Sequence, residues 1–416
     1  MMRVLLASDH YPPFVGGAQR QTQLLAQQLH ARGHEVRVAT VWNDELPDRS
    51  QDGAVPVIRL RQLRTLPVVK GRPRRRHQPP FPDPVTVVEL RRLVREFRPD
   101  VVHVAGWMAF SASAALAGTD VPLVYSARDY GFTCATATLL NRGRACSGPA
   151  LGKCLACAGE YYGRPRGWIA VGGVAASAPL LRRRATGIHA VSSYVAEIAE
   201  RDLYRGVGGP AVAPAVIGSF RVDEPEEEVA AAELPGALPD EPFILFVGAL
   251  RRVKGLAVLF DAYRRLESPP PLVLIGTLER DTPTDVPDGA VILSQLPHAA
   301  VLRAWDRSLF GVMPSLWPEP FGSVVHEAMS RGRPVIGTTP GGHADMITDG
   351  ETGFLVPAGD VDALTAAMRR LLDDPQLCAD MGERARDASA AFDAADAIPR
   401  FERLYRDAVA AAGAHG

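Results

Sequence analysis

The sequence predicts an α/β protein of two domains, each built on a parallel sheet. Short apolar runs bounded by Gly or Pro alternate with segments of helical periodicity in both halves of the chain, which is typical of repeated βαβ units. The length of 416 residues suits two domains of about 200 residues each. An acidic segment that contains several prolines, residues 222–242, separates the two halves.

The apolar runs predict buried strands in each half. In the N-terminal half they are Val4–Ser8, Glu35–Val41, Val55–Leu60, Val101–Val104, Leu123–Ser126 and Ile188–Val191. In the C-terminal half they are Phe243–Gly248, Leu272–Ile275, Val291–Leu293, Leu309–Met313, Pro334–Gly337 and Phe354–Val356. We therefore expect an N-terminal domain over residues 1–218, a linker over 219–242 and a C-terminal domain over 243–390. The remaining residues, 391–416, have the period of a helix.

Composition and charge narrow the class of protein. No apolar run reaches the roughly 18 residues that span a bilayer, and the N-terminus lacks a signal peptide, so we expect a cytoplasmic protein. Residues 1–218 hold 28 Lys and Arg against 16 Asp and Glu, whereas residues 219–416 hold 18 against 31. This asymmetry predicts an anionic partner for the N-terminal half.

The densest basic run is Lys70–Pro80, which Pro and Gly keep from forming a helix. It could dock on a phosphorylated molecule or on anionic lipid at the inner face of a membrane. A solvated loop explains the same residues. Nucleic acid is not expected, because aromatic residues do not interleave with the charges and no known binding module is recognised.

The segment Met313–Phe354 carries the strongest chemical signal. A predicted strand ends at Met313, Pro and Gly then interrupt regular structure, and a helical pattern begins at Ser323. The start of such a helix faces the carboxyl edge of a parallel sheet, where its free N–H groups favour an anion such as a diphosphate. Glu319 could accept hydrogen bonds from sugar hydroxyls, and Glu327 could reach a ribose diol. Alternatively, Glu319 is a loop charge and Glu327 a solvated helix residue.

Two further loops between a strand and a helix have residues suited to an anionic ligand. Gly16 and Gly17 follow the first strand, and without a Cβ they let the backbone approach a ligand closely, although a plain tight turn explains them equally. In the second domain, Gly248 ends the first strand and is followed by Arg251 and Lys254. These cations could balance the charge of a leaving diphosphate.

These segments resemble the retaining glycosyltransferases of family 4. The donor-site signature of that family has E-P-F-G, a second Glu eight positions after the first, then G-R-P-V-I, G-G and D-G-x-T-G-F-L-V. The matching residues here are Glu319-Pro320-Phe321-Gly322, Glu327, Gly332-Arg333-Pro334-Val335-Ile336, Gly341-Gly342 and Asp349–Val356. The P-P-x-x-G-G opening and the Lys254-Gly255 pair also match. The resemblance implies the GT-B fold, in which two Rossmann-like domains face a central cleft.

The resemblance also implies an activity. The enzyme would transfer a sugar from a nucleoside-diphosphate sugar, with UDP or GDP as the expected nucleotide, and would retain the anomeric configuration. The N-terminal domain would bind the acceptor, which in this family is a glycan, glycolipid, polysaccharide or natural product. The last helix would pack back on the N-terminal domain. The alternative is a catalytically degenerate protein that binds a sugar or an anion.

By the same resemblance, the donor site lies in the C-terminal domain. Glu319 would contact the donor sugar and Glu327 the ribose, within a site that also includes Gly248, Pro320, Phe321, Gly322 and Ser323. Lys254, Arg251 and the helix after Gly322 would hold the leaving diphosphate, so that no catalytic metal is required. Gly16 and Gly17 would line the cleft near the donor phosphates.

The sequence departs from the family at two positions. Ala249 stands where the family has an arginine, and Arg251 could substitute for it. Arg128 stands where the family has the histidine of a His-Asp pair, followed here by Asp129. Arg128 could select an anionic sugar or acceptor, or it could simply pair with Asp129. His103 matches a D-V-V-H motif at the end of a strand, where a histidine is more often structural than catalytic.

Four of the five cysteines lie close together in an irregular, glycine-rich insert at about residues 132–160. They are Cys134, Cys146, Cys154 and Cys157. A C-x2-C pair with two further cysteines predicts a tetrahedral structural zinc site in a cytoplasmic protein. Disulfides and free thiols are the alternatives. Some family members carry a similar insert on the acceptor side of the cleft.

Overall fold

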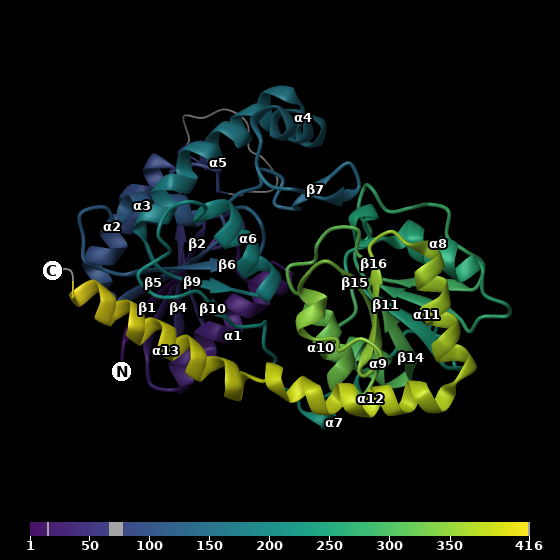
Figure 1. Cartoon of the computed structure of the whole chain (residues 1–416). Coiled ribbons are helices and arrows are strands. Elements are labelled where there is room, and N and C mark those ends of the chain that lie inside the picture. The colour runs from purple at the N-terminus through teal and green to yellow at the C-terminus, as the bar shows by residue number, and fades with distance from the viewer. Residues whose placement is uncertain (15, 66–77, 415–416) are drawn as a thin grey trace. The chain divides into compact units, whose positions relative to one another are not determined.

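The computed structural model describes residues 1–14, 16–65 and 78–414, and the chain divides into two compact units (Figure 1). The first unit comprises Met1–Leu139, Ser147–Ser219 and Ala394–Gly416, and the second comprises Leu140–Cys146 and Phe220–Asp393. Each unit contains one large sheet. The basic run predicted at Lys70–Pro80 lies outside the described residues except for its last three, Gln78–Pro80.

The sheet of the first unit has the strand order β10-β9-β6-β5-β1-β2-β4-β3. All neighbouring strands are parallel except β3 and β4. The central strands are buried along most of their length, as expected for a sheet covered by helices on both faces. β3 has the sequence RSQD and contains no apolar run, so it was not predicted from the sequence. The bounds are β1 (Arg3–Ser8), β2 (Glu35–Val41), β3 (Arg49–Asp52), β4 (Val55–Leu60), β5 (Val101–Ala105), β6 (Leu123–Ala127), β9 (Ala185–Ala190) and β10 (Ala215–Val216).

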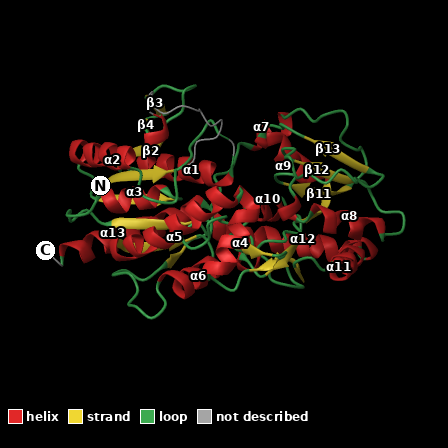
Figure 2. Cartoon of the chain, turned by 90° about the horizontal axis from the view of Figure 1, so that it is seen from above, coloured by secondary structure: helices red, strands yellow, loops and turns green. Residues whose placement is uncertain are grey.

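Helices connect these strands, as Figure 2 shows in red beside the yellow sheet. α2 illustrates the local signals: the Asp83 side chain accepts hydrogen bonds from the backbone N–H groups of Val85 and Thr86, and Pro84 occupies the first helical position. The bounds are α1 (Gly17–Ala31), α2 (Pro84–Phe97), α3 (Met108–Ala115), α4 (Leu151–Tyr162), α5 (Arg164–Arg184) and α6 (Ser193–Leu203).

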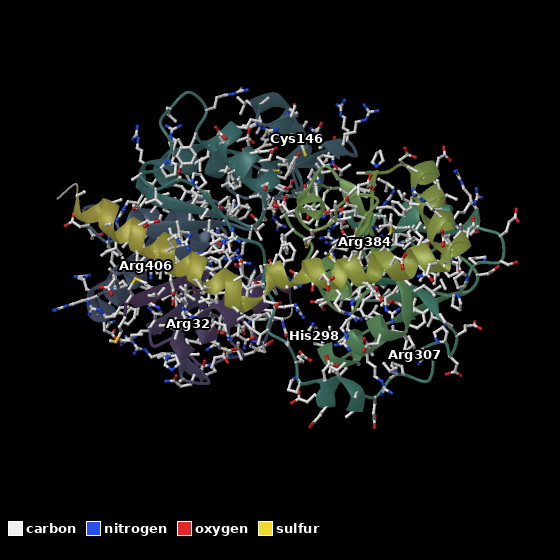
Figure 3. All side chains as sticks on the ribbon, turned by 60° about the horizontal axis from the view of Figure 1, so that its bottom comes forward. Arg32, Cys146, His298, Arg307, Arg384 and Arg406 are labelled. Carbon is white, nitrogen blue, oxygen red and sulfur yellow. The ribbon has the colours of Figure 1, made fainter. Side chains whose placement is uncertain are left out.

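The C-terminal helix α13 (Ala394–Gly413) packs against strands of the first unit. Its buried face includes Phe401, Leu404 and Tyr405. Polar contacts hold it as well, because Glu402 accepts hydrogen bonds from Arg32 Nε at 2.7 Å and lies 3.1 Å from His34 Nε2. Figure 3 labels Arg32 beside this helix.

The sheet of the second unit has the order β13-β12-β11-β14-β15-β16, and every pair of neighbours is parallel. Its strands are β11 (Phe243–Val247), β12 (Leu272–Ile275), β13 (Ala290–Leu293), β14 (Ser308–Val312), β15 (Val335–Thr339) and β16 (Gly353–Pro357). Its main helices are α8 (Leu256–Arg264), α9 (His298–Arg307), α10 (Ser323–Ser330), α11 (Val361–Asp373) and α12 (Pro375–Ser389). The prediction of an α/β protein with two parallel sheets is confirmed.

Part of the predicted linker is ordered within the second unit. Glu226–Ala231 forms the short helix α7 after Pro225, with three glutamates in the first turn where the helix dipole favours negative charge. Val229 is buried, and Glu226 pairs with Arg331 at 2.6 Å.

No helix among the described residues is both long enough and apolar enough to cross a membrane.

The hairpin β7 (Leu140–Asn141) and β8 (Arg144–Ala145) lies in the cysteine-rich insert, and its residues belong to the second unit.

Candidate functional site

Glu319 lies in the loop between β14 and α10, at the carboxyl end of the sheet of the second unit. The residue is 8% exposed, so its carboxylate needs partners. One oxygen, Oε2, accepts hydrogen bonds from Lys254 Nζ at 2.7 Å, Trp317 Nε1 at 2.8 Å and Ser315 Oγ at 3.0 Å. The other oxygen, Oε1, accepts none within the described part of the chain. Glu319 is therefore held rigidly through one oxygen, while the other remains available to a ligand.

The electrostatics keep Glu319 ionised. Burial by itself raises the pKa of this carboxyl, but the charge of Lys254 and the hydrogen bonds from Lys254 and Ser315 outweigh burial and hold the pKa below its usual value. Lys254 also lies 5.4 Å from the centre of the Trp317 ring. The sequence places Lys254 and Glu319 in different loops, and the sheet brings them into contact.

Glycines shape the loop around Glu319. A Cβ on Gly342 would lie 2.3 Å from the carbonyl oxygen of Pro320, and the N–H of Gly342 donates to the carbonyl of Glu319 at 2.7 Å. Gly322 has φ of 88°, and a Cβ there would lie 2.7 Å from His343 Nε2. The Gly341-Gly342 turn and the Glu319 loop therefore pack backbone against backbone, which explains the glycines that the sequence motif contains.

The N-terminus of α10 is open. Its N-cap is Gly322, no side chain caps it, and no acidic residue lies in the first turn, which begins at Ser323. Its free N–H groups and the positive end of the helix dipole suit a phosphate.

His343 lies beside this end of α10, and sequence reasoning missed it. Burial lowers the pKa of His343 to about 4, so the ring is neutral near pH 7. Its Nδ1 accepts the N–H of Thr338 at 3.1 Å, which assigns the proton to Nε2. No local pattern distinguishes this histidine from a structural one.

Glu327 is not the solvated helix residue of the alternative interpretation. Its side chain is 17% exposed, and Oε1 lies 3.3 Å from His298 Nε2. On its other side, His298 Nδ1 lies 2.6 Å from Glu224 Oε1. His298, labelled in Figure 3, thus sits between two carboxylates and orients Glu327. Sequence reasoning missed both His298 and Glu224, because they are distant from Glu327 along the chain.

Three other predicted residues of the second unit make contacts of different kinds. Arg251 Nε lies 3.3 Å from Asp281 Oδ1, so this cation is already shared with a carboxylate. Phe321 is buried and packs edge-on against Phe392, with ring centres 5.7 Å apart, so its contacts are those of the core. Gly248 has φ of 149°, and its carbonyl oxygen lies so close to Gly276 that a Cβ on Gly276 would be 1.7 Å from it.

In the first unit, His103 is a core residue. It is buried, and its Nδ1 lies 2.5 Å from the hydroxyl of Tyr405 on α13. Burial, and secondarily the charge of Arg128, lower the pKa of His103 to about 3, so it stays neutral. Its position links β5 to the C-terminal helix.

Arg128 does not pair with Asp129. Asp129 accepts the N–H of Gly131 at 2.8 Å, and burial raises the pKa of its carboxyl. Arg128 makes no ion pair or hydrogen bond with any of the residues that the structure describes, and burial lowers its pKa to about 10. It lines a small cavity of about 10 Å³ together with His103, Ser126 and other residues of the sheet edge. The cavity is no larger than about one water molecule, so an anion that pairs with this guanidinium would lie outside it.

Gly16 and Gly17 stand at the start of α1. The N-cap is Gly16, no side chain caps the helix, and its first turn contains no acid. A Cβ on Gly16 would meet only the far end of the flexible Gln19 side chain, so packing alone does not demand a glycine there.

Asp9, at the end of β1, is a further residue that sequence reasoning missed. Its carboxylate accepts the N–H groups of Trp107 at 2.9 Å and Met108 at 2.7 Å. A Cβ on Gly106 would lie 2.6 Å from its Oδ2, so the loop closes tightly over it. Burial, opposed by these hydrogen bonds and reinforced by Asp129, raises the pKa of Asp9 to about 7.

This raised pKa predicts a pH dependence of stability. Between its ordinary pKa of 3.8 and about 7, Asp9 is ionised in the unfolded chain but still binds its proton in the folded one. The free energy of unfolding should therefore fall as pH rises through this window. Asp9→Asn should lose that part of the fall, so that its deficit against the wild type shrinks from pH 5 to pH 8.

Thermal unfolding of both proteins across this pH range checks the prediction. Asp407→Asn is the control, because Asp407 is exposed on α13. If the difference between wild type and Asp9→Asn is the same at every pH, Asp9 does not titrate in this window.

The predicted zinc site is not formed. Within residues 1–14, 16–65 and 78–414, no group of three or more His, Cys, Asp or Glu side chains could hold a metal ion. No disulfide involves Cys134, Cys146, Cys154 or Cys157. Cys154 and Cys157 lie on the regular helix α4, where Cys154 packs against a small apolar cluster and its sulfur accepts the N–H of Ala150 at 3.4 Å. Packing of α4 on α5 stabilises the insert.

Comparison with known proteins decides the family. A family model described as "Glycosyl transferase 4-like domain" matches residues 16–219, and one described as "Glycosyl transferases group 1" matches residues 233–388. The chain belongs to glycosyltransferase family 4. The predicted family and the predicted activity, glycosyl transfer, are thereby confirmed.

Individual relatives of this glycosyltransferase match most of its length or a part of it. It is 26% identical to a glycogen synthase of Mycobacterium tuberculosis over 413 residues, covering 90% of this chain and 87% of the relative. A D-inositol 3-phosphate glycosyltransferase of Paenarthrobacter aurescens is 31% identical over 172 residues, covering 38% of this chain and 42% of the relative.

Solved structures show the same fold. A sucrose-phosphate synthase from Thermosynechococcus elongatus superposes with a TM-score of 0.75 at 21% identity, covering 99% of this chain and 100% of that one. Anabaena HepE, solved in complex with UDP-glucose, superposes with a TM-score of 0.67 at 18% identity, covering 98% and 100%. The GT-B fold is confirmed.

Proposed function

We propose that this glycosyltransferase moves a sugar from a UDP- or GDP-sugar to an anionic acceptor and retains the anomeric configuration. The observation that carries the proposal is the buried Glu319 carboxylate, held through one oxygen by Lys254 beside the uncapped start of α10. The loop thus presents a carboxylate that can accept hydrogen bonds from sugar hydroxyls. It also presents N–H groups that can donate hydrogen bonds to a diphosphate. Retention rests on the family, and the UDP complex of HepE supports a nucleotide of this kind.

In the proposed mechanism, the N–H groups at the start of α10 and the Lys254 ammonium hold the diphosphate as it leaves. Negative charge develops on its oxygens as the bond to the sugar breaks, and preorganised donors stabilise that charge most. Glu319 Oε1 accepts from a hydroxyl of the donor sugar and fixes its orientation. Glu327, oriented by His298, accepts from the ribose hydroxyls. The acceptor hydroxyl oxygen bonds to the anomeric carbon as the bond from that carbon to the diphosphate breaks, and the departing diphosphate oxygen takes the hydroxyl proton.

These residues supply the charge balance of the leaving group themselves, so we propose that no catalytic metal is needed. Lys254, which pairs with Glu319, is the main cation of the proposed diphosphate site, and Arg251, which pairs with Asp281, is the second.

We place the acceptor on the first unit and propose that it is negatively charged. The N-terminal half is strongly basic, and Arg128 has no counter-ion among the described residues. Binding of a phosphate-bearing probe to the first unit is the direct sign of such an acceptor.

A panel of nucleoside diphosphates tests the donor site. UDP, GDP, ADP, CDP and dTDP are added without divalent metal, and the thermal midpoint is measured. A nucleotide at about 100 times its dissociation constant should stabilise the folded protein by about 2.7 kcal/mol. We expect one nucleotide to give this shift, and Glu327→Ala to lose it while Glu383→Ala, an exposed residue of α12, keeps it.

If no nucleotide shifts the midpoint, the donor site is absent, and the protein is a degenerate GT-B protein that binds another ligand. Ala249 stands where the family has an arginine, and the loss of this cation is a reason to test for that outcome.

A further inference from the structure

The first unit contains a pocket that the proposed transfer reaction does not use. It has a volume of about 350 Å³ and lies between α4, α5, α6 and the loop after β6. A cavity of about 150 Å³ already holds benzene, and ligand pockets commonly begin at about 300 Å³. The pocket is therefore large enough for an organic ligand. All its lining residues belong to the first unit.

Its walls are mostly apolar. Phe132, Val171, Val174 and Leu203 are buried and line it, together with small residues of α5 and the start of α4. Because many side chains of α5 in this wall are short, α4 and α5 leave space between them. Leu151 lines the pocket as well, yet it is 72% exposed. An apolar ligand would therefore bury surface that is otherwise exposed to water.

The two charged residues of the lining, Asp202 and Arg182, differ in their partners. Asp202 is neutralised, since it accepts from Arg201 Nε at 2.7 Å and from Thr133 Oγ1 at 3.1 Å. Arg182 also lines the pocket, and it forms neither an ion pair nor a hydrogen bond with the residues covered by the structure. An apolar space with an unneutralised cation in its wall matches a ligand with an apolar chain and an anionic head.

We propose that this pocket binds the apolar chain of a single-chain amphiphile whose phosphate head group pairs with Arg182. The chain contacts the walls formed by α4 and α5, and the head remains at the charged wall. This binding does not depend on the proposed transfer reaction.

Calorimetric titration of the full-length protein with decyl phosphate, below its micelle concentration and without nucleotide, tests the proposal. Ethyl phosphate tests the need for the chain, and decyl glucoside tests the need for the charge. We expect decyl phosphate to bind at least about tenfold more tightly than either, since a charged hydrogen bond and a buried chain each contribute more than 1.4 kcal/mol, which is about tenfold in affinity.

Matched variants locate the site. Ala178→Phe fills the pocket from α5 and should weaken decyl phosphate about tenfold, whereas Ala176→Phe, exposed on the same helix outside the lining, should not. Arg182→Gln should weaken decyl phosphate about tenfold but leave decyl glucoside unchanged, and Arg183→Gln, exposed and outside the lining, is its control.

Two results would overturn the proposal: decyl phosphate that binds no better than ethyl phosphate, or equal losses in Ala176→Phe and Ala178→Phe. Glu319→Gln separates the two proposals, because it should keep the binding of decyl phosphate whatever its effect on glycosyl transfer.

Discussion

Glu319→Gln should lower turnover about a hundredfold to a thousandfold, the usual loss when one preorganised group at a transition state is removed. The substitution keeps the size of the side chain but removes the charge that holds Lys254 at 2.7 Å. Lys254 would then no longer be fixed beside the diphosphate, and the donor sugar would lose an ionised acceptor. Release of nucleoside diphosphate from the donor that the nucleotide panel identifies measures the effect.

The control for this variant is Glu351→Gln, which changes an exposed glutamate of the same unit. Nucleotide binding by Glu319→Gln should weaken less than turnover, because Glu327 and α10 are unchanged although Lys254 is no longer fixed. Turnover equal to that of the wild type would show that Glu319 has a structural role only.

Gly255→Ala should destabilise the second unit by about 3 kcal/mol, the sum of a left-handed backbone cost and a packing conflict. Gly255 has φ of 77°, and a Cβ there would lie 1.8 Å from the carbonyl oxygen of Pro314. Relief requires the loop that carries Lys254 to move away from the end of β14, so the response to nucleotide should be lost as well. Urea unfolding and the nucleotide panel measure both effects.

Gly350→Ala is the matched control, because Gly350 has the same φ of 77° and nothing within 4 Å of its Cβ position. It should cost only about 1 kcal/mol, from the backbone alone. If the two variants are equally stable, the close approach of Gly255 to Pro314 does not constrain the loop.

The strands were predictable because each is a local pattern. The apolar runs of both halves became the strands of two parallel sheets, and Gly and Pro bounded them. The polar edge strand β3 could not be found in this way, since its pairing with β4 depends on the neighbour and not on its own apolar residues.

The prediction of zinc was wrong for a related reason. Close spacing of four cysteines along the chain suggested a shared metal. Spacing along the chain, however, does not determine whether the four side chains point toward one another. In the structure Cys154 and Cys157 lie on a helix whose packing against α5 already stabilises the insert. The same helix pair creates the apolar pocket, which no periodicity in the sequence indicates.

The sequence by itself determined the family, the two sheets and the motif that carries Glu319 and Glu327, because these depend on residue type and short spacing. Only the tertiary structure decided which groups meet. Lys254 reaches Glu319, His298 joins Glu224 to Glu327, and Arg128 has no counter-ion among the residues that the structure describes. The physical reason is that charge pairing and burial depend on distances between strands and helices that are remote along the chain, and packing alone sets those distances.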